Sequence, residues 1–227
     1  MPQMHRRNLV KLAGALPVLG SGASAATPPR IVAIIESGNA VAGSPTVARA
    51  VDKLRQALAA HGAGLEIAGT NSGAALALIV AAPDGALAAG FAPGRHAQTV
   101  PEQFRIAPGT LSGSPALLVS ARDIRGFVYG LLELAERVQF GGVAALHLKD
   151  VVDEAPANRV RSVARAFCSE IEDKPWFYSE DFWHGYLDML VACRFYPEKL
   201  TTSPMPKLSE FTTPYQALRR GCLQLFW

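Results

Sequence analysis

Residues 120–139 read SARDIRGFVYGLLELAERVQ, and the apolar side chains in this stretch recur at spacings of three and four. This spacing predicts a long amphipathic helix, with Asp123 as its N-cap. Its apolar stripe comprises Ile124, Phe127, Val128, Leu131, Leu132, Ala135 and Val138. Gly126 and Gly130 lie one turn apart on the helix, and without β-carbons they allow a close neighbour. We expect that neighbour to be a β-sheet rather than a ligand.

The residues before this helix follow an α/β pattern. A buried-strand run at residues 31–35 precedes Ser44 and Pro45, which supply the N-cap and first residue of another helix. Further strands are expected at residues 65–68, 76–82, 103–106, 117–119 and 146–152. The strands at 103–106 and 117–119 could pair as an antiparallel edge. Together these elements predict an accessory α/β domain over residues 30–155, a small sheet with packed helices.

A second unit is expected to follow a linker at residues 154–157. Residues 160–167 form an apolar run. Residues 176–194 have the pattern of a loop followed by an amphipathic helix with Ser179 as N-cap. The buried stripe of that helix is predicted to be Trp183, Tyr186, Leu187, Leu190 and Val191. Such a strand–helix module needs a neighbouring strand to cover its apolar face, and no such strand is recognisable in residues 196–227. We therefore expect an incomplete barrel start at 158–195 and an irregular tail.

Composition limits the classes of function. The chain has 227 residues, of which 49% are hydrophobic and 18% charged, so it is expected to fold. A complete eight-stranded α/β barrel needs roughly 250 residues by itself. The 22 basic and 19 acidic residues leave no basic footprint, so nucleic acid is not an expected partner. The three cysteines form no metal-binding motif. We expect no cofactor and no metal, with Cys168 and Cys193 as buried thiols and a bridge between them as the alternative.

The first residues have the layout of a signal peptide. Arg6 and Arg7 resemble the twin-arginine export motif, and a mildly apolar run leads to a small-residue site ending at Ala25. This layout predicts cleavage after residue 25 and a periplasmic or extracellular protein. The alternative is an ordinary basic N-terminus. Because the apolar run is too short to span a bilayer, no membrane association is expected once the leader is removed.

Candidate binding residues follow or lie within the apolar run of the second unit. Ligands of α/β barrels meet the carboxyl ends of the strands, where Glu170 and Glu172 are expected. These carboxylates could hydrogen-bond sugar hydroxyls, or they could belong to a solvated acidic loop. Arg161 could contact a substrate, or it could form a structural ion pair with a barrel neighbour. No catalytic residue is assigned.

Two of these stretches resemble a known group of enzymes. Residues 120–139 resemble the last helix of the small N-terminal domain that precedes the barrel in bacterial β-hexosaminidases and α-glucuronidases. Residues 158–195, NRVRSVARAFCSEIEDKPWFYSEDFWHGYLDMLVACRF, are similar to the first strand and helix of the barrel in exported relatives. The resemblance implies a non-catalytic domain followed by a glycoside-hydrolase barrel. It also implies a carbohydrate ligand and a sugar-binding role for Arg161.

The chain departs from that pattern after Phe195. The catalytic acids of the family lie on later barrel strands, whereas this chain continues as YPEKLTTSPMPK. We therefore expect the accessory domain and barrel stub of an exported glycoside-hydrolase-like protein. It would act in carbohydrate metabolism, be inactive as this chain, and come from a truncated or frameshifted gene. The alternative is a small extracytoplasmic module that binds carbohydrate or a protein partner.

Overall fold

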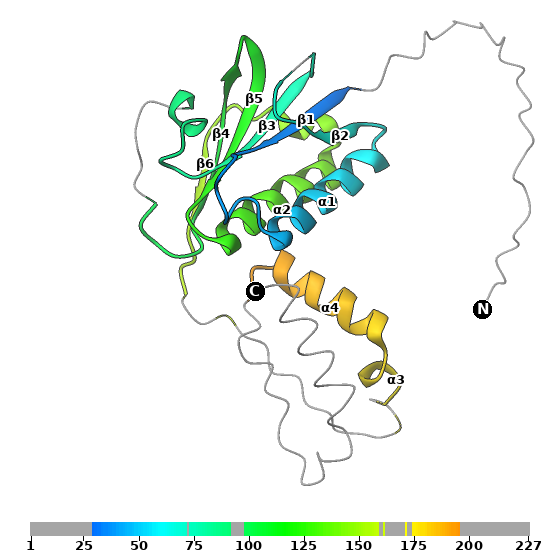
Figure 1. Cartoon of the computed structure of the whole chain (residues 1–227). Helices are drawn as coiled ribbons and strands as arrows, with labels where there is room; N and C mark the ends of the chain where they lie inside the picture. Colours follow the sequence, from blue (N-terminus) through cyan, green and yellow to red (C-terminus); the bar gives the residue numbers. More distant parts are fainter. Residues whose placement is uncertain are drawn as a thin grey trace, which may run out of the picture.

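The computed structural model describes residues 29–71, 73–91, 98–158, 161, 171 and 174–195. Its centre is a six-stranded sheet in the order β2-β1-β3-β5-β4-β6, with two long helices on one face (Figure 1). The strands are β1 (Arg30–Ile35), β2 (Gly64–Ile67), β3 (Leu76–Ala81), β4 (Phe104–Leu111), β5 (Ser114–Ala121) and β6 (Val152–Glu154). The helices are α1 (Pro45–Ala60), α2 (Ile124–Gly141), α3 (Lys174–Phe177) and α4 (Glu180–Ala192), with 3-10 turns η1 (Ala88–Gly90) and η2 (Val143–Leu146). The predicted α/β class, a small sheet with packed helices, is confirmed.

The sheet is mixed. Strands β1, β2, β3 and β5 are parallel, and β4 runs antiparallel to both β5 and β6. At the β4–β5 turn, Ser112 and Gly113 both have positive φ, 50° and 80°, as a tight type I′ hairpin requires. The predicted antiparallel pair is therefore confirmed, but its position at the sheet edge is wrong. Strand β6 covers β4, and β5 continues into the parallel half of the sheet.

The strand predicted at residues 146–152 is also wrong. The chain forms η2 up to Leu146, and strand β6 begins only at Val152. The amides of His147 and Leu148 bond to carbonyls two or three residues back, which satisfies them locally. Leu146 is buried at 2% exposure in the core that α2 also faces. The alternating pattern thus arises from a turn with one buried leucine.

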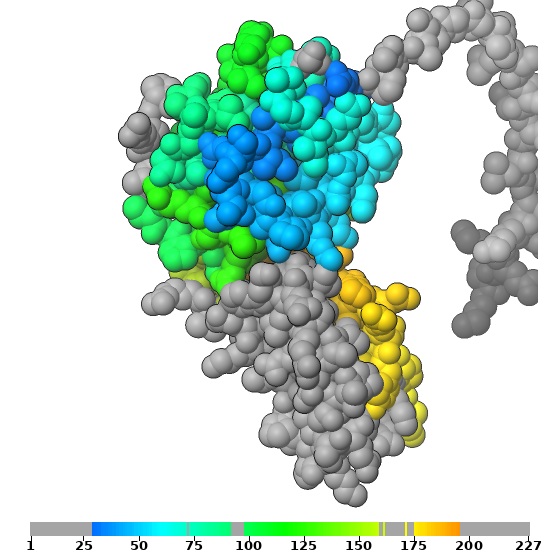
Figure 2. All heavy atoms as spheres, in the orientation of Figure 1, coloured from blue at the N-terminus to red at the C-terminus, as the bar shows by residue number. Residues whose placement is uncertain are grey.

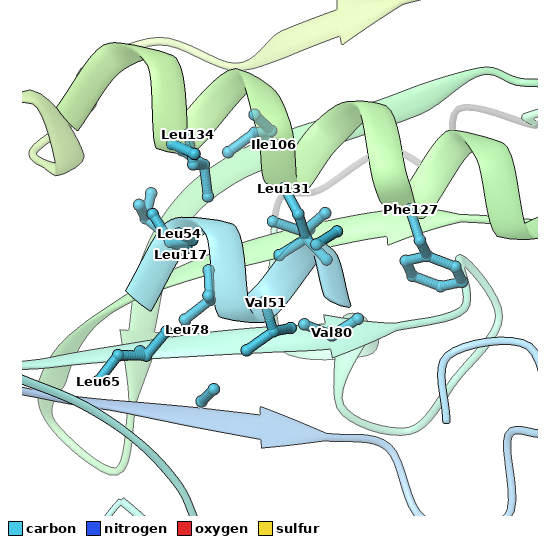
Figure 3. Packing of buried hydrophobic residues seen from close by; sticks show 14 of the residues in the cluster. Val51, Leu54, Leu65, Leu78, Val80, Ile106, Leu117, Phe127, Leu131 and Leu134 are labelled. Carbon is cyan, nitrogen blue, oxygen red and sulfur yellow. The ribbon is translucent and has the colours of Figure 1, made fainter. Parts of the chain in front are cut away.

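The main core lies between the two long helices and one sheet face. Figure 3 shows Val51 and Leu54 of α1 and Leu131 of α2 packed together above the sheet. On the opposite face, Ala88 and Phe91 at the 3-10 turn η1 belong to the same smaller cluster as Ile79 and other sheet residues. Among the described residues, no helix has the length and apolar character needed to cross a bilayer.

Gly126 and Gly130 of α2 lie directly on the sheet, as predicted. A β-carbon on Gly126 would come within 2.5 Å of the Gln103 carbonyl oxygen and 2.8 Å of the Ala121 β-carbon. One on Gly130 would lie 2.8 Å from a methyl carbon of Val119. These distances are below ordinary contacts, so a larger residue requires the backbone to move at Gly126 and buried side chains to move at Gly130.

This close approach gives a matched pair of predictions for stability. We expect Gly126→Ala to lower the free energy of unfolding by about 1–3 kcal/mol, because the backbone of residue 103 must move. Gly185 lies within α4 with nothing within 4 Å of its added β-carbon. Gly185→Ala should therefore raise stability by about 0.5–1 kcal/mol through helix propensity. Urea unfolding followed by circular dichroism measures both, and equal effects would contradict this packing.

Within residues 176–194 a loop and then an amphipathic helix capped by Ser179 are predicted, and α4 confirms that helix. The Ser179 hydroxyl caps it by accepting a hydrogen bond from the Phe182 amide at 3.1 Å. The buried residues are Trp183, Leu187, Leu190 and Val191, whereas Tyr186 is half-buried. Cys193 is a free, exposed thiol at the helix C-cap, so the prediction of a buried thiol is wrong there. It follows the last buried residue of the stripe and lies on the solvent side.

Other predictions fall on residues outside those described. These are the export segment with Arg6, Arg7 and Ala25, the carboxylates Glu170 and Glu172, the thiol of Cys168, most of the strand at 160–167, and the tail at 196–227.

Candidate functional site

Arg161 lies where the segment after β6 returns to the sheet. Its Nε donates to the Arg194 carbonyl oxygen at 2.6 Å, and Nη1 donates to the Asn158 carbonyl oxygen at 2.7 Å. Its Nη2 forms an ion pair with Glu102. The side chain is 17% exposed. Of the two roles considered for Arg161, the structure contains the structural ion pair, with a partner from the loop before β4 instead of from a barrel strand. Sugar binding by Arg161 stays a prediction.

Glu102 is held in position by the start of α2. Its second carboxylate oxygen accepts a hydrogen bond from Arg125 Nη1 at 2.8 Å. Its backbone amide donates to Asp123 Oδ2 at 2.6 Å, and Asp123 Oδ1 caps the amide of Gly126. Glu102 adopts φ of 65°, a left-handed conformation that costs a non-glycine residue energy. The N-cap of α2 therefore also fixes the carboxylate that receives Arg161.

Arg194 makes a second contact of the same kind from the end of α4. It has φ of 61°, and its guanidinium pairs with Glu133 of α2 at 2.7 Å and with Glu154 of β6. The guanidinium carbon also lies 5.1 Å from the centre of the Phe104 ring. We call Glu102, Arg161, Glu133, Glu154 and Arg194 the clamp cluster. It joins residues 30–154, which contain the sheet and its two long helices, to the segment that carries α4.

Tyr129 extends the clamp cluster into the core. It is 5% exposed, and its hydroxyl oxygen accepts a hydrogen bond from Arg161. Burial raises the pKa of Tyr129, the negative charge of Glu102 raises it further, and Arg161 opposes the shift. The hydrogen bonds to Glu102 and Tyr129 raise the pKa of Arg161 even though burial lowers it. The net rise in the pKa of Arg161 favours its charged form.

The shift of Tyr129 predicts loss of stability at alkaline pH. In the unfolded chain this hydroxyl ionises near its ordinary value of 10.0, and in the folded chain it ionises later. The stabilisation is therefore complete below pH 10.0 and disappears as the pH rises through the raised pKa. In an ultraviolet titration of tyrosinate, Tyr129→Phe should remove the most alkaline component. If the tyrosinate signal that this variant loses titrates together with that of the remaining tyrosines, Tyr129 is not buried in the core.

A separate crevice lies at the carboxyl ends of β1 and β3. It has a volume of about 650 Å³ and is lined by the end of β1 and the loop after it (residues 34–39), by residues 82 and 84–87 after β3, and by Gly69. Figure 2 shows the segment after β1, in blue, on the face turned toward the viewer. Glu36 is half-buried there, and its Oε2 accepts hydrogen bonds from the Ala82 amide at 3.0 Å and from Asn39 Nδ2 at 3.1 Å. Asp84 lies at the rim.

Sequence reasoning missed Glu102 and Glu36. Glu102 lies in a loop with no motif, and only the structure shows that it meets Arg161, 59 residues further along the chain. Glu36 follows a buried strand directly, which is the same signal that singled out Glu170 and Glu172. Among the described residues, no group of three or more His, Cys, Asp or Glu side chains is placed to hold a metal ion.

Comparison with known proteins relates the fold to glycoside hydrolases. No protein-family model matches the sequence, and no curated protein matches it either. The solved structure of a GH138 enzyme targeting pectin rhamnogalacturonan II superposes with a TM-score of 0.52 at 20% identity over 74% of this chain. A GH115 4-O-methyl-α-glucuronidase with specificity for decorated arabinogalactans superposes with a TM-score of 0.52 at 16% identity, also over 74%.

These similarities establish a fold shared with part of each enzyme. The chain spans 23% of the first enzyme and 24% of the second. A third structure, from a GH84 protein, reaches a TM-score of only 0.45 at 7% identity. At the level of the fold, the resemblance to a domain of α-glucuronidases and related glycoside hydrolases is confirmed.

Proposed function

We propose that this chain contains the accessory domain and first barrel unit of an exported glycoside-hydrolase-like protein. In this proposal, residues 30–155 hold the following unit, residues 158–195, in a fixed orientation. The observation that carries the proposal is the clamp cluster. Arg161 and Arg194, both from the following unit, are paired with carboxylates from the sheet, from α2 and from the loop before β4.

Ionic contacts of this kind suit a positioning role. The side chains of Arg161, Glu102 and Glu133 are 17%, 11% and 17% exposed, so little solvent screens their charges. Removing charges from water offsets much of the attraction between them, which makes such pairs modest sources of net stability. Their geometry is strict, however, because a guanidinium meets a carboxylate in few orientations. The clamp cluster would therefore select one orientation of the following unit.

We further propose that the ligand class is carbohydrate and that this chain does not itself hydrolyse glycosides. Glycoside hydrolysis needs an acid and a second carboxylate about 5–9.5 Å apart across the scissile bond. Among the described residues, the carboxylates that pair with Arg161 and Arg194 accept bonds from arginine side chains. These carboxylates therefore position the two arginines instead of flanking a glycosidic bond.

Enzyme assays test this part of the proposal. Purified protein is expected to release no chromophore above the blank from aryl glucuronides or aryl N-acetylhexosaminides. The matched variants are Glu170→Gln and Glu172→Gln, which alter the two carboxylates predicted at the barrel strand end. Turnover in the wild type that disappears in either variant would show an active enzyme and contradict the proposal.

Export is tested by mass spectrometry of the secreted protein. The twin arginines and the small-residue site support a mature chain that starts after Ala25. Replacing Arg6 and Arg7 together by lysine should abolish export by the twin-arginine route. A secreted chain that retains Met1, or export that survives the double replacement, would contradict this part.

A second candidate function, a carbohydrate-binding module, is favoured by one specific observation. The crevice at β1 and β3 combines carboxylate groups with an apolar lining, and none of the residues that line it belongs to the clamp cluster.

A further inference from the structure

We propose that the crevice after β1 and β3 is a binding site for a neutral sugar. This inference rests on the proposed function in one respect only, which is that the ligand is a carbohydrate. It adds a site that belongs to the sheet itself and is independent of any barrel. Its principal residues are Glu36, Asp84 and Gly85.

The topology of the sheet places the crevice where α/β proteins bind ligands. Strand β1 connects through α1 to β2 on one side, while its other neighbour, β3, continues the sheet in the opposite direction. The loops leaving β1 and β3 therefore diverge, and the space between them opens at the carboxyl ends of two parallel strands. Ligands of open α/β sheets bind at such switch points, where an acidic side chain can hydrogen-bond ribose hydroxyls.

The polar groups of the crevice favour a ligand that donates hydrogen bonds. Glu36 Oε2 is already occupied by the Ala82 amide and by Asn39. Asn39 Oδ1 in turn accepts from the amides of Val41 and Ala42, so it cannot serve a ligand as well. The charged capacity that remains is the other oxygen of Glu36 and the carboxylate of Asp84, beside the Ser37 hydroxyl and the second N–H of Asn39 Nδ2. Both carboxylates only accept hydrogen bonds, and sugar hydroxyls, which donate as well as accept, match this mixed set.

The rest of the lining favours a neutral ligand over an anionic one. Ile34, Ile35 and Leu87 contribute apolar surface, which suits the C–H face of a pyranose ring. The described lining contains no lysine, arginine or histidine. An anionic ligand such as a phosphate or a uronate would therefore meet only negative charge. The volume of about 650 Å³ accommodates a ligand of one or two rings.

Gly85 keeps the Glu36 carboxylate in place. A β-carbon on Gly85 would lie 1.9 Å from Glu36 Oε1 and 2.6 Å from its carboxyl carbon. Any side chain at this position must displace the carboxylate. Gly85→Ala therefore tests the geometry of the site without removing a charge.

The experiment is a titration of isotope-labelled protein by NMR with methyl glucoside, methyl galactoside and methyl rhamnoside, with glucuronate and Ca²⁺ as separate arms. We expect at least one neutral sugar to shift the amides of residues 36–39, 82 and 84–87. Asp84→Asn and Gly85→Ala should each weaken binding by about tenfold or more. The matched control is Asp150→Asn, which changes an exposed carboxylate outside the crevice and should leave affinity unchanged.

Four results would overturn the proposal: no shift with any neutral sugar, shifts confined to other residues, glucuronate binding as tightly as the neutral sugars, or Ca²⁺ alone shifting the crevice. The amide spectrum of each variant reports its fold, so a loss of binding is not confused with unfolding. Each of these outcomes can be distinguished from a failure of the positioning role proposed for the clamp cluster. If the crevice stays empty while α4 remains protected by Glu102, the crevice proposal fails and the positioning role stands.

Discussion

Glu102→Gln is expected to loosen α4 from the sheet while leaving the sheet folded. The substitution removes the charge that receives Arg161 and Arg125, and both guanidinium groups stay in a partly buried position. Removing one partner of a buried ion pair costs about 3 kcal/mol or more, because the remaining charge is uncompensated. That cost corresponds to an increase of about a hundredfold in the population in which α4 is detached. Hydrogen exchange of the α4 amides measures it.

The matched control for Glu102 is Glu66. It pairs with Arg30 at 2.8 Å, but the side chains of both partners are about half exposed, at 59% and 47%. Glu66→Gln should change stability by about 0.5 kcal/mol or less, since solvent screens an exposed pair. If both variants leave the exchange of α4 unchanged, the clamp cluster does not hold α4.

Phe104→Ala is expected to be the most damaging single substitution in the core. Phe104 is 1% exposed and lies against Gly130 of α2, where an added β-carbon would meet its ring at 3.2 Å. Deleting a buried phenylalanine ring costs about 3–5 kcal/mol. The substitution also removes the aromatic surface that Arg194 covers. Exchange of α4 should therefore accelerate together with that of β4.

Urea unfolding of Phe104→Ala and of Phe140→Ala provides the comparison. Phe140 lies near the end of α2 and is 79% exposed, so its removal should have little effect on stability. A loss of less than about 1 kcal/mol in Phe104→Ala would place that ring outside a packed core.

Local signals predict most of the helices and strands. The apolar spacing and N-caps of α1, α2 and α4 depend on neighbours within the same helix, so each is recognisable from its own residues. The position of the β4–β5 hairpin within the sheet cannot be recognised from the residues of the hairpin alone. It depends on β6, a strand of three residues that carries almost no pattern of its own. The same limit explains why the pattern of residues 146–152 indicates a strand that does not form.

Of the two candidate sites, one could be predicted from local sequence and the other could not. Glu36 follows a buried strand, so the rule that places ligands at strand ends could have found it. The pairing of Arg161 with Glu102 could not be predicted, because it joins two loops that only the folded chain brings together. Arg161 stands out in the sequence as a charged residue in an apolar run, and burial of its charge is what requires a partner.

A double-mutant cycle between Glu102 and Arg161 tests the central claim most directly. The free energy of opening of α4 is measured by hydrogen exchange for the wild type, Glu102→Gln, Arg161→Met and the double variant. If the pair holds α4 to the sheet, the second substitution should cost little once the first is made, giving a coupling energy of about 1.5 kcal/mol or more. Effects that add to within about 0.5 kcal/mol would show that the two residues act independently and would contradict the positioning role.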